Sequence, residues 1–299
     1  MTLEQESCYV TVGGHSLHVR RIAPAVPVHG EPVLMVHGAI ENGRIFYTES
    51  GKGLACFLAR HGFCVYVADL RGRGASQPCI ANEAQHGQFE LITEDIPALH
   101  AWVRERHGGA RVHWMAHSWG GVIMASTLVR QPPLSGEVAS LLFFGTKRGI
   151  SVQGPERWFK VDLLWNRLAP WLARRHGFFA ARRYGIGADD EPLAYLQETI
   201  PWVKGGPWVD PRDGFDYDSA ASGVSWPPLW MIAARADRVL GHPNDVQHFQ
   251  NEMGAHGRFT LLSRANGNRL DYDHINMLTA PQATEDHFPA ILSWLDQVA

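Results

Sequence analysis

The sequence of 299 residues has few cysteines, few charged residues and no long hydrophobic run. Its four cysteines, Cys8, Cys56, Cys64 and Cys79, form no CxxC pair and no metal-ligand pattern with nearby histidines. This spacing favours reduced thiols over a disulfide framework. No stretch reaches the roughly 20 apolar residues of a membrane-spanning helix, so we expect no stable membrane insertion.

An excess of one charge sign is also absent. The net charge is −3, and no basic stripe with interleaved aromatic residues is present, which argues against nucleic acid as a partner. Residues 1–6 are acidic and contain no apolar stretch, so no signal peptide is predicted and a cytoplasmic location is expected. Nothing in the sequence indicates the oligomeric state. Because 45% of the residues are hydrophobic, the chain can form a large core.

Short apolar segments alternate with longer segments of helical periodicity along most of the chain. A hairpin is expected over residues 9–20, around two glycines. Strands are expected at residues 32–36, 63–68, 111–116, 138–144, 229–233 and 258–262, and helices at 53–61, 92–106, 120–130, after Pro243 and at 288–298. This alternation predicts an α/β fold with a doubly wound, mostly parallel sheet.

The alternation stops between residues 147 and 225. Six of the eleven tryptophans lie in this stretch or at its end. We interpret residues 147–225 as a helical cap, or lid, inserted into a core formed by residues 1–146 and 226–299. Such an insertion is expected over the carboxyl edge of the sheet, where parallel sheets bind ligands.

The strongest local signal is the hexapeptide at residues 116–121, Ala-His-Ser-Trp-Gly-Gly, between a predicted strand and a predicted helix. A nucleophilic serine needs a sharp strand-to-helix turn that presents its Oγ above the sheet. Small residues two positions before and after the serine, here Ala116 and Gly120, allow the strand and helix to approach. Ser118 is therefore the predicted nucleophile.

A serine requires a base, and the base requires an orienting acid. Asp237 follows a predicted strand and is the expected acid, with Asp245 as the alternative. His274 lies in the loop after the last predicted strand and is the expected base, with His287, near the start of the last helix, as the alternative. Enzymes whose nucleophilic serine lies on such a turn typically carry the three residues in the order Ser, Asp, His along the chain.

A reaction at a carbonyl also needs N–H donors for the developing oxyanion. One expected donor is the backbone N–H of Trp119, directly after the nucleophile. The other is expected from Ala39 or Ile40, in the loop after the strand at residues 32–36, with the sequence leaving these two open. His37 and Gly38 in the same loop are expected beside the substrate.

Together, His37-Gly38, the sequence Asp-Leu-Arg-Gly-Arg-Gly at residues 69–74, the serine turn, Asp237 and His274 resemble the α/β-hydrolase superfamily, of the serine esterase and lipase type. The resemblance covers residues 8–146 and 226–298. It implies that residues 69–74 form a structural loop, and that an alanine in place of the usual glycine at position 116 is compatible with a lipase-like turn.

The resemblance also narrows the chemistry. Haloalkane dehalogenases and epoxide hydrolases of this superfamily use aspartate at the nucleophile position, so Ser118 implies acyl transfer. A small-molecule carboxylic ester is the expected substrate, while a thioester or a carbon–carbon bond beside a ketone is the alternative. A ligand-binding protein without catalysis is a further alternative. The mechanism requires no metal and no organic cofactor.

The predicted cap carries an apolar stripe and an uneven charge. Residues spaced by three or four from Trp158 to Leu172 form the stripe, and Pro170 is expected to break or restart the helix near Ala169. Residues 151–188 contain seven basic and two acidic residues, whereas residues 189–222 contain two and eight. Either the stripe packs on the core, or the cap contacts a lipid interface. Phe178, Phe179 and Trp119 are expected to line an apolar substrate pocket.

Overall fold

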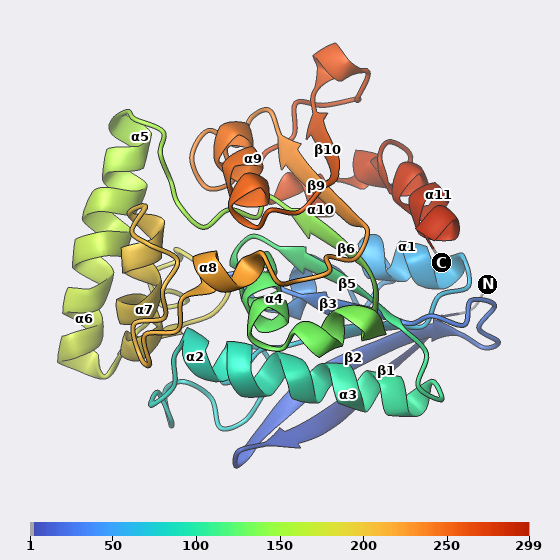
Figure 1. Cartoon of the computed structure of the whole chain (residues 1–299), viewed down its shortest axis with the longest axis horizontal. Helices are drawn as coiled ribbons and strands as arrows, with labels where there is room; N and C mark the ends of the chain where they lie inside the picture. Colours follow the sequence, from blue (N-terminus) through green and yellow to red (C-terminus); the bar gives the residue numbers. More distant parts are fainter. Residues whose placement is uncertain (1–2, 299) are drawn as a thin grey trace.

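An eight-stranded sheet forms the centre of the computed structural model, which describes residues 3–298 (Figure 1). Met1, Thr2 and Ala299 lie outside the described residues, including the first two residues of the acidic stretch. The order across the sheet is β1-β2-β4-β3-β5-β6-β9-β10. The strands are β1 Leu3–Val12, β2 His15–Pro24, β3 Val33–Val36, β4 Val65–Ala68, β5 Val112–His117, β6 Val138–Phe144, β9 Leu229–Ala234 and β10 Gly257–Leu262.

The sheet is parallel except at one edge. Strands β4, β3, β5, β6, β9 and β10 pair in parallel, whereas β1 and β2 form an antiparallel hairpin that continues onto β4. The predicted α/β fold with a doubly wound, mostly parallel sheet is therefore confirmed. The hairpin is longer than expected, because its strands extend beyond residues 9–20 on both sides.

Helices cover both faces of the sheet. In β3, Leu34 and Val36 join the core under α3 (Ile96–Arg106), α4 (Trp119–Arg130), α8 (Tyr217–Ala221) and α9 (Pro243–Glu252). Val33 and Met35 join the core under α1 (Leu54–Arg60) and α11 (Phe288–Val298). All four residues are buried, as expected for a strand between two helical layers. The helices outside the insertion are α1 Leu54–Arg60, α2 Gln88–Glu90, α3 Ile96–Arg106, α4 Trp119–Arg130, α9 Pro243–Glu252, α10 Asn276–Thr279 and α11 Phe288–Val298, with π-helical turns at Leu91–Asp95 and 3-10 turns at Gly43–Ile45, Pro132–Glu137, Arg264–Asn266 and Pro281–Thr284.

The stretch between β6 and β9 combines helices with a small hairpin and irregular segments. It contains α5 Pro155–Arg157, a π-helix at Trp158–Leu168, α6 Ala169–His176, α7 Leu193–Val203, α8 Tyr217–Ala221 and a small hairpin of β7 Phe178–Phe179 with β8 Glu191–Pro192. In Figure 1 the helix from α5 to α6 and helix α7 lie together at one side of the sheet. Only part of this stretch has a core of its own, because Trp202, Trp208 and Tyr217 pack into the core beside α4.

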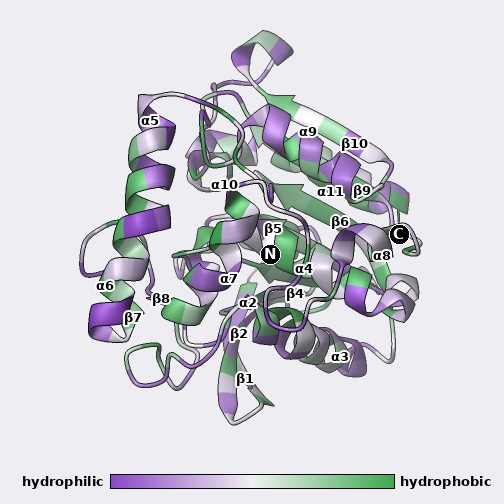
Figure 2. Ribbon diagram, turned by 60° about the vertical axis from the view of Figure 1, so that its left-hand side comes forward, coloured by the Kyte–Doolittle hydropathy of each residue, from purple (hydrophilic) through white to green (hydrophobic). Residues whose placement is uncertain are grey.

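At Pro170 the helix is not broken but restarts as α6 at Ala169, which is one of the two expected outcomes. Residues 155–176 are helical throughout, and Pro170 lies where π-helical hydrogen bonding changes to α-helical. The wider π turn is compatible with a residue that lacks an N–H. In a π-helix, residues spaced by three or four positions do not lie on one face. Trp158 and Leu168 of the expected stripe are therefore exposed, while Val161 is buried. Figure 2 shows hydrophobic and hydrophilic residues alternating along this helix.

Among residues 3–298, no helix is both long and apolar enough to cross a bilayer. This finding agrees with the absence of long hydrophobic runs in the sequence.

Candidate active site

Ser118 lies on a strained turn between β5 and α4. Its backbone φ of 51° is in the left-handed region, which is unusual for a residue with a side chain. Helix α4 begins close to the loop after β3, since a Cβ at Gly120 would lie only 2.4 Å from the carbonyl oxygen of His37. Ala116, two residues before the serine, is completely buried. The local sequence therefore forms the strand-to-helix turn that it predicted.

The side chains of Ser118, His274 and Asp237, which the sequence predicted as the nucleophile, base and acid, form one continuous chain of hydrogen bonds. His274 Nε2 is 2.9 Å from Ser118 Oγ, and His274 Nδ1 is 2.5 Å from Asp237 Oδ2. Asp237 follows β9 and His274 lies in the loop after β10, so both are held at the edge of the sheet where β5 ends. All three side chains are buried. This geometry suits proton transfer from the serine to the imidazole.

The charges in this chain of hydrogen bonds follow from burial and pairing. Burial opposes ionisation of Asp237, but the charge and hydrogen bond of His274 outweigh it, and the pKa of Asp237 falls to about 2. Burial also lowers the pKa of His274 below its ordinary value, against the attraction of Asp237. At neutral pH the site therefore contains an ionised carboxylate and a neutral imidazole, which is the state that can accept a proton.

The two alternatives from the sequence have other partners. Asp245, in α9, accepts hydrogen bonds from the backbone N–H and the hydroxyl of Ser151. His287 is buried rather than solvated, and its Nε2 donates to the carbonyl oxygen of Met277. Neither side chain contacts Ser118.

The structure separates the two candidates for the second oxyanion donor. The N–H of Ile40 donates to Glu191 Oε1 at 2.5 Å, so it is already used. Among the described residues, the N–H groups of Ala39 and Trp119 have no hydrogen-bond partner. Gly38 brings the loop against the nucleophile, because a Cβ there would lie 2.7 Å from Ser118 Cβ. Ala39 and Trp119 are therefore the available pair of donors.

His37 supports the loop instead of facing a substrate. Its Nδ1 donates to the carbonyl oxygen of Gly38 at 2.8 Å, and its Nε2 accepts from the N–H of Leu70 at 3.1 Å. Both ring nitrogens are thus occupied by backbone groups, and burial lowers the pKa of the ring. The expectation that His37 contacts substrate does not fit this arrangement.

The two phenylalanines of the expected pocket differ in position. Phe179 is fully buried in the small core of the insertion, with Ala169, Ala173 and Leu196, so it does not line a pocket. Phe178 is half-buried in β7 and pairs with Pro192. The sequence could not make this distinction, because it depends on how the hairpin packs.

Comparisons with known proteins agree with this architecture. A family model described as alpha/beta hydrolase fold matches residues 31–184, just over half of the chain. The chain belongs to the alpha/beta hydrolase fold family. No curated protein is similar enough in sequence to match it.

Solved structures share the fold of this alpha/beta hydrolase at low sequence identity. A soluble variant of monoglyceride lipase from Saccharomyces cerevisiae is 16% identical with a TM-score of 0.67, covering 100% of this chain and 97% of that one. An esterase from Exiguobacterium antarcticum is 16% identical with a TM-score of 0.63, covering 97% and 100%. Haloalkane dehalogenase DbeA from Bradyrhizobium elkani is also 16% identical, with a TM-score of 0.58 and 99% of each chain covered. These similarities establish the fold, which supports several reactions.

The alpha/beta hydrolase site contains a lysine that sequence reasoning missed. Lys147 follows the carboxyl end of β6, and its Nζ lies 3.4 Å from Ser118 Oγ. The side chain is buried, which lowers its pKa, while the carboxylates of Asp237, Glu41 and Asp245 favour the charged form. Its position at the end of a strand was the available signal, since ligands bind at that edge of the sheet.

A second histidine supports the loop of His274. His117, directly before the nucleophile, donates from Nε2 to the carbonyl oxygen of His274 at 2.8 Å, and its Nδ1 lies 2.8 Å from Glu41 Oε2. Burial opposes a charge on His117, but the Glu41 carboxylate outweighs it and raises the pKa of His117. Despite burial, the His117 charge and hydrogen bond lower the pKa of Glu41 to about 2. This buried pair fixes the backbone that carries His274.

The insertion fastens the loop that follows β3. Glu191 pairs with the guanidinium of Arg73 and accepts from the N–H of Ile40. Asp189 accepts from the side chain of Asn42 at 2.9 Å and from the N–H of Gly74 at 2.8 Å. Both carboxylates come from the insertion and both hold residues of the core. The insertion therefore shapes the site even where it does not touch Ser118.

Proposed function

We propose that this alpha/beta hydrolase cleaves carboxylic esters through an acyl-enzyme on Ser118. The observation that carries the proposal is the chain of hydrogen bonds from Ser118 through His274 to Asp237. The proposed core is residues 1–146 and 226–299, with residues 147–225 as the cap over the site.

In the proposed reaction, His274 Nε2 takes the proton of Ser118 Oγ while Oγ forms a bond to the ester carbonyl carbon. Asp237 stabilises the imidazolium. The N–H groups of Trp119 and Ala39 donate to the oxyanion of the tetrahedral intermediate. As the intermediate collapses, the bond to the alkoxy oxygen breaks, and His274 returns the proton to the departing alcohol.

Water then completes the cycle. His274 takes a proton from water, the hydroxide oxygen attacks the acyl carbon, and the bond to Ser118 Oγ breaks as the proton returns to it. The acid is released and the serine is restored. The ammonium group of Lys147, 3.4 Å from Ser118 Oγ, adds a positive charge beside both negatively charged intermediates.

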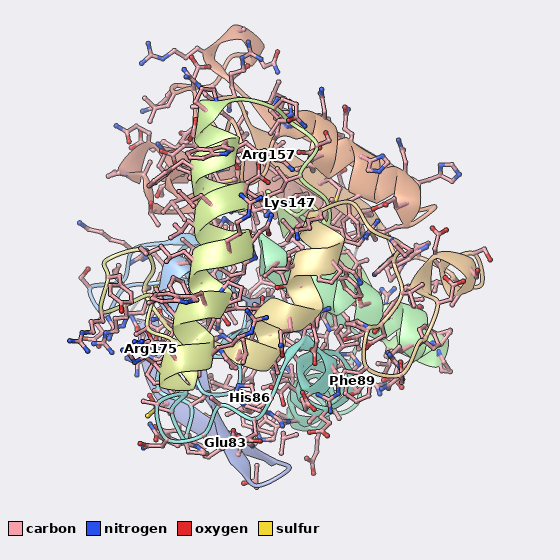
Figure 3. The ribbon with its side chains drawn as sticks, turned by 90° about the vertical axis from the view of Figure 1, so that its left-hand side faces the viewer. Glu83, His86, Phe89, Lys147, Arg157 and Arg175 are labelled. Atoms are coloured by element: carbon pink, nitrogen blue, oxygen red, sulfur yellow. The ribbon has the colours of Figure 1, made fainter. Side chains whose placement is uncertain are left out.

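The substrate that fits best is an apolar ester presented at a lipid surface. The helix over residues 155–176 exposes four large apolar side chains, Trp158, Phe159, Leu168 and Trp171, all at least 40% exposed. Basic residues lie on the same helix, and Figure 3 shows Arg157 near one end of it and Arg175 near the other. Exposed tryptophan beside basic residues is typical of helices that rest on anionic lipid.

Turnover of p-nitrophenyl esters of increasing chain length tests the proposal. Wild-type protein is expected to release p-nitrophenol, and Ser118→Ala is expected to reduce kcat by roughly 10⁶-fold. Acyl-CoA in a parallel assay separates ester from thioester cleavage. Absence of ester turnover in the wild type, or unchanged turnover in Ser118→Ala, contradicts the proposal.

A further inference from the structure

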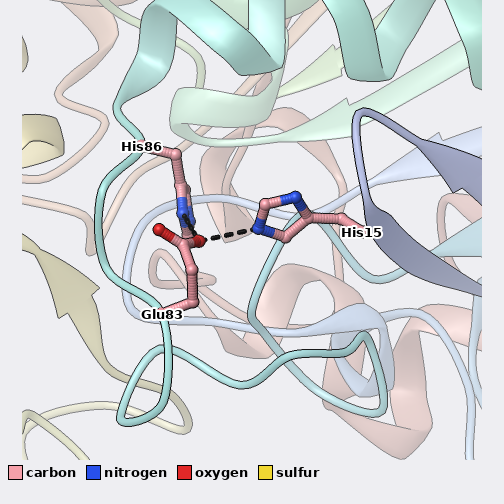
Figure 4. A group of neighbouring side chains, drawn as sticks. All are labelled: His15, Glu83 and His86. Carbon is pink, nitrogen blue, oxygen red and sulfur yellow. Dashed lines mark hydrogen bonds and ion pairs between the residues drawn. The ribbon is translucent and has the colours of Figure 1, made fainter.

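A second group of chemically active side chains lies away from Ser118. His15, at the start of β2, and Glu83 and His86, in the loop before α2, converge so that one ligand atom from each lies within 4.8 Å of the others (Figure 4). His15 Nε2 is 2.7 Å from Glu83 Oε2, and His86 Nδ1 is 3.0 Å from the same oxygen. The sequence could not reveal this group, because 68 residues separate His15 from Glu83.

We propose that His15, Glu83 and His86 bind a divalent transition-metal ion, with Zn²⁺ as the best fit. Two imidazoles and one carboxylate are a ligand set that zinc uses in proteins, with water in the fourth position. Zinc–ligand distances of about 2.0–2.2 Å put the ligand atoms of a tetrahedral site roughly 3.3–3.5 Å apart. The two contacts to Glu83 Oε2 are slightly shorter than that, so small side-chain movements open the site.

The distal ring nitrogens support this assignment. His15 Nδ1 faces the carbonyl oxygen of Gly13 at 3.4 Å, and His86 Nε2 faces that of Arg71 at 3.2 Å. A metal-binding histidine characteristically donates its other N–H to a carbonyl or carboxylate, which fixes the tautomer and the ring orientation. In each ring, an N–H toward the carbonyl leaves the nitrogen nearer Glu83 with a free lone pair.

The tautomer of His86 explains why a cation suits this position. Both of its nitrogens face oxygen acceptors, yet a neutral imidazole has only one N–H. A lone pair on Nδ1 would then face the Glu83 carboxylate, and a metal ion between them satisfies both groups.

Access and charge also fit a metal ion. His86 is buried, whereas the side chain of Glu83 is 26% exposed, so the group opens to solvent on one side. The Glu83 side chain supplies a carboxylate oxygen as the anionic ligand of the group.

The location indicates a structural role. An ion here would join the hairpin of β1 and β2 to the loop that leads into α2. Gln88 of α2 accepts a hydrogen bond from Trp119 Nε1 at 3.1 Å, so this loop also supports the residue after the nucleophile. Figure 3 shows Glu83 and His86 well separated from Lys147, which contacts Ser118, so the ion would not act on the reacting atoms.

The test measures zinc bound by the full chain after treatment with a chelator, addition of ZnSO₄ and dialysis. One equivalent of zinc per chain is expected by elemental analysis, and less than a tenth of that in His15→Ala. Glu83→Gln is a second variant that keeps the shape of the side chain. His256→Ala, which removes an exposed histidine outside the group, serves as the control and is expected to retain zinc.

Two readouts separate a specific site from loose binding. Co²⁺ in place of zinc is expected to give the visible absorption of a low-coordinate site in wild type and His256→Ala, and none in His15→Ala. Zinc at one hundred times its Kd is expected to raise the Tm by about 4 °C in the same two proteins. Absence of bound zinc in the wild type, or equal zinc in wild type and both cluster variants, overturns the proposal.

Discussion

At the residue scale, the pKa of His274 controls when the proposed reaction can start. Burial lowers this pKa below the ordinary 6.5, and the base acts only in its neutral form. We therefore expect kcat/KM for ester hydrolysis to rise with pH through a midpoint below 6.5 and then to level off. The pH dependence of kcat/KM measures this midpoint directly.

Replacing Lys147 tests its electrostatic contribution. Its positive charge is one of the influences that lower the pKa of His274, so Lys147→Met is expected to move the midpoint to higher pH. The same substitution is expected to lower kcat, because the charge beside the anionic intermediates is lost. Lys52→Met, which changes an exposed lysine, is the matched control. An unchanged midpoint in Lys147→Met would show that the ammonium group does not act on the imidazole.

Gly38 offers a test of the loop that follows β3. An added Cβ would lie 2.7 Å from Ser118 Cβ and 3.2 Å from the carbonyl oxygen of His117, so the loop must shift. We expect Gly38→Ala to reduce kcat by about 10²-fold, the effect of losing one oxyanion donor, while the fold is retained. Gly136→Ala is the control, because a Cβ there meets nothing within 4 Å. Steady-state kinetics with circular dichroism on both variants provides the comparison.

At the scale of elements, one link between the insertion and the core is a buried ion pair. Arg73, in the loop after β4, and Glu191, in β8, are both almost completely buried. Glu191→Gln leaves the guanidinium without its counter-charge and is expected to lower the free energy of unfolding by about 3–5 kcal/mol. Urea unfolding measures this loss.

A double variant distinguishes the pair from its separate parts. Arg73→Met together with Glu191→Gln removes both charges, so we expect it to be more stable than Glu191→Gln alone. If the double variant instead loses the sum of the two single effects, the two side chains act independently, and the insertion is held by other contacts.

The elements themselves were largely predictable from the sequence. Apolar segments of strand length identified the parallel strands, and the range of the last helix, residues 288–298, agrees with α11. The last part of the insertion was harder to predict. Trp202, Trp208 and Tyr217 belong to the main core, and the periodicity of a sequence does not show which core a residue joins. The π-helix at Trp158–Leu168 was also missed, since its wider turns break the spacing on which the stripe was based.

The position of a site residue could be predicted from the sequence where the preceding strand determines it. Ser118 and Asp237 come shortly after strands, and His274 lies in the loop after β10, so their convergence follows from the parallel sheet. Lys147 also follows a strand but belongs to no pattern, and the partner of Ile40 comes from a segment 151 residues away. Contacts of that kind depend on how the insertion packs, which a single sequence does not encode in any local signal.

At the scale of the whole molecule, the exposed face of the helix over residues 155–176 is the surface that we propose contacts lipid. We expect the protein to sediment with vesicles that contain anionic lipid, and to dissociate from them as the salt concentration rises. The double variant Trp158→Ser and Trp171→Ser is expected to reduce the bound fraction severalfold. Tyr9→Ser, a change at another exposed aromatic residue, is the control. Equal binding by both variants would contradict a role for this face.

The central claim is that Ser118 is a nucleophile activated by His274. Labelling with a fluorophosphonate, followed by peptide mass spectrometry, tests it most directly, because the reagent bonds covalently only to an activated serine hydroxyl. We expect one adduct per chain, located on Ser118, and a strongly reduced labelling rate in His274→Ala. An unlabelled wild-type protein, an adduct on another residue, or labelling of Ser118 at the same rate in His274→Ala would contradict it.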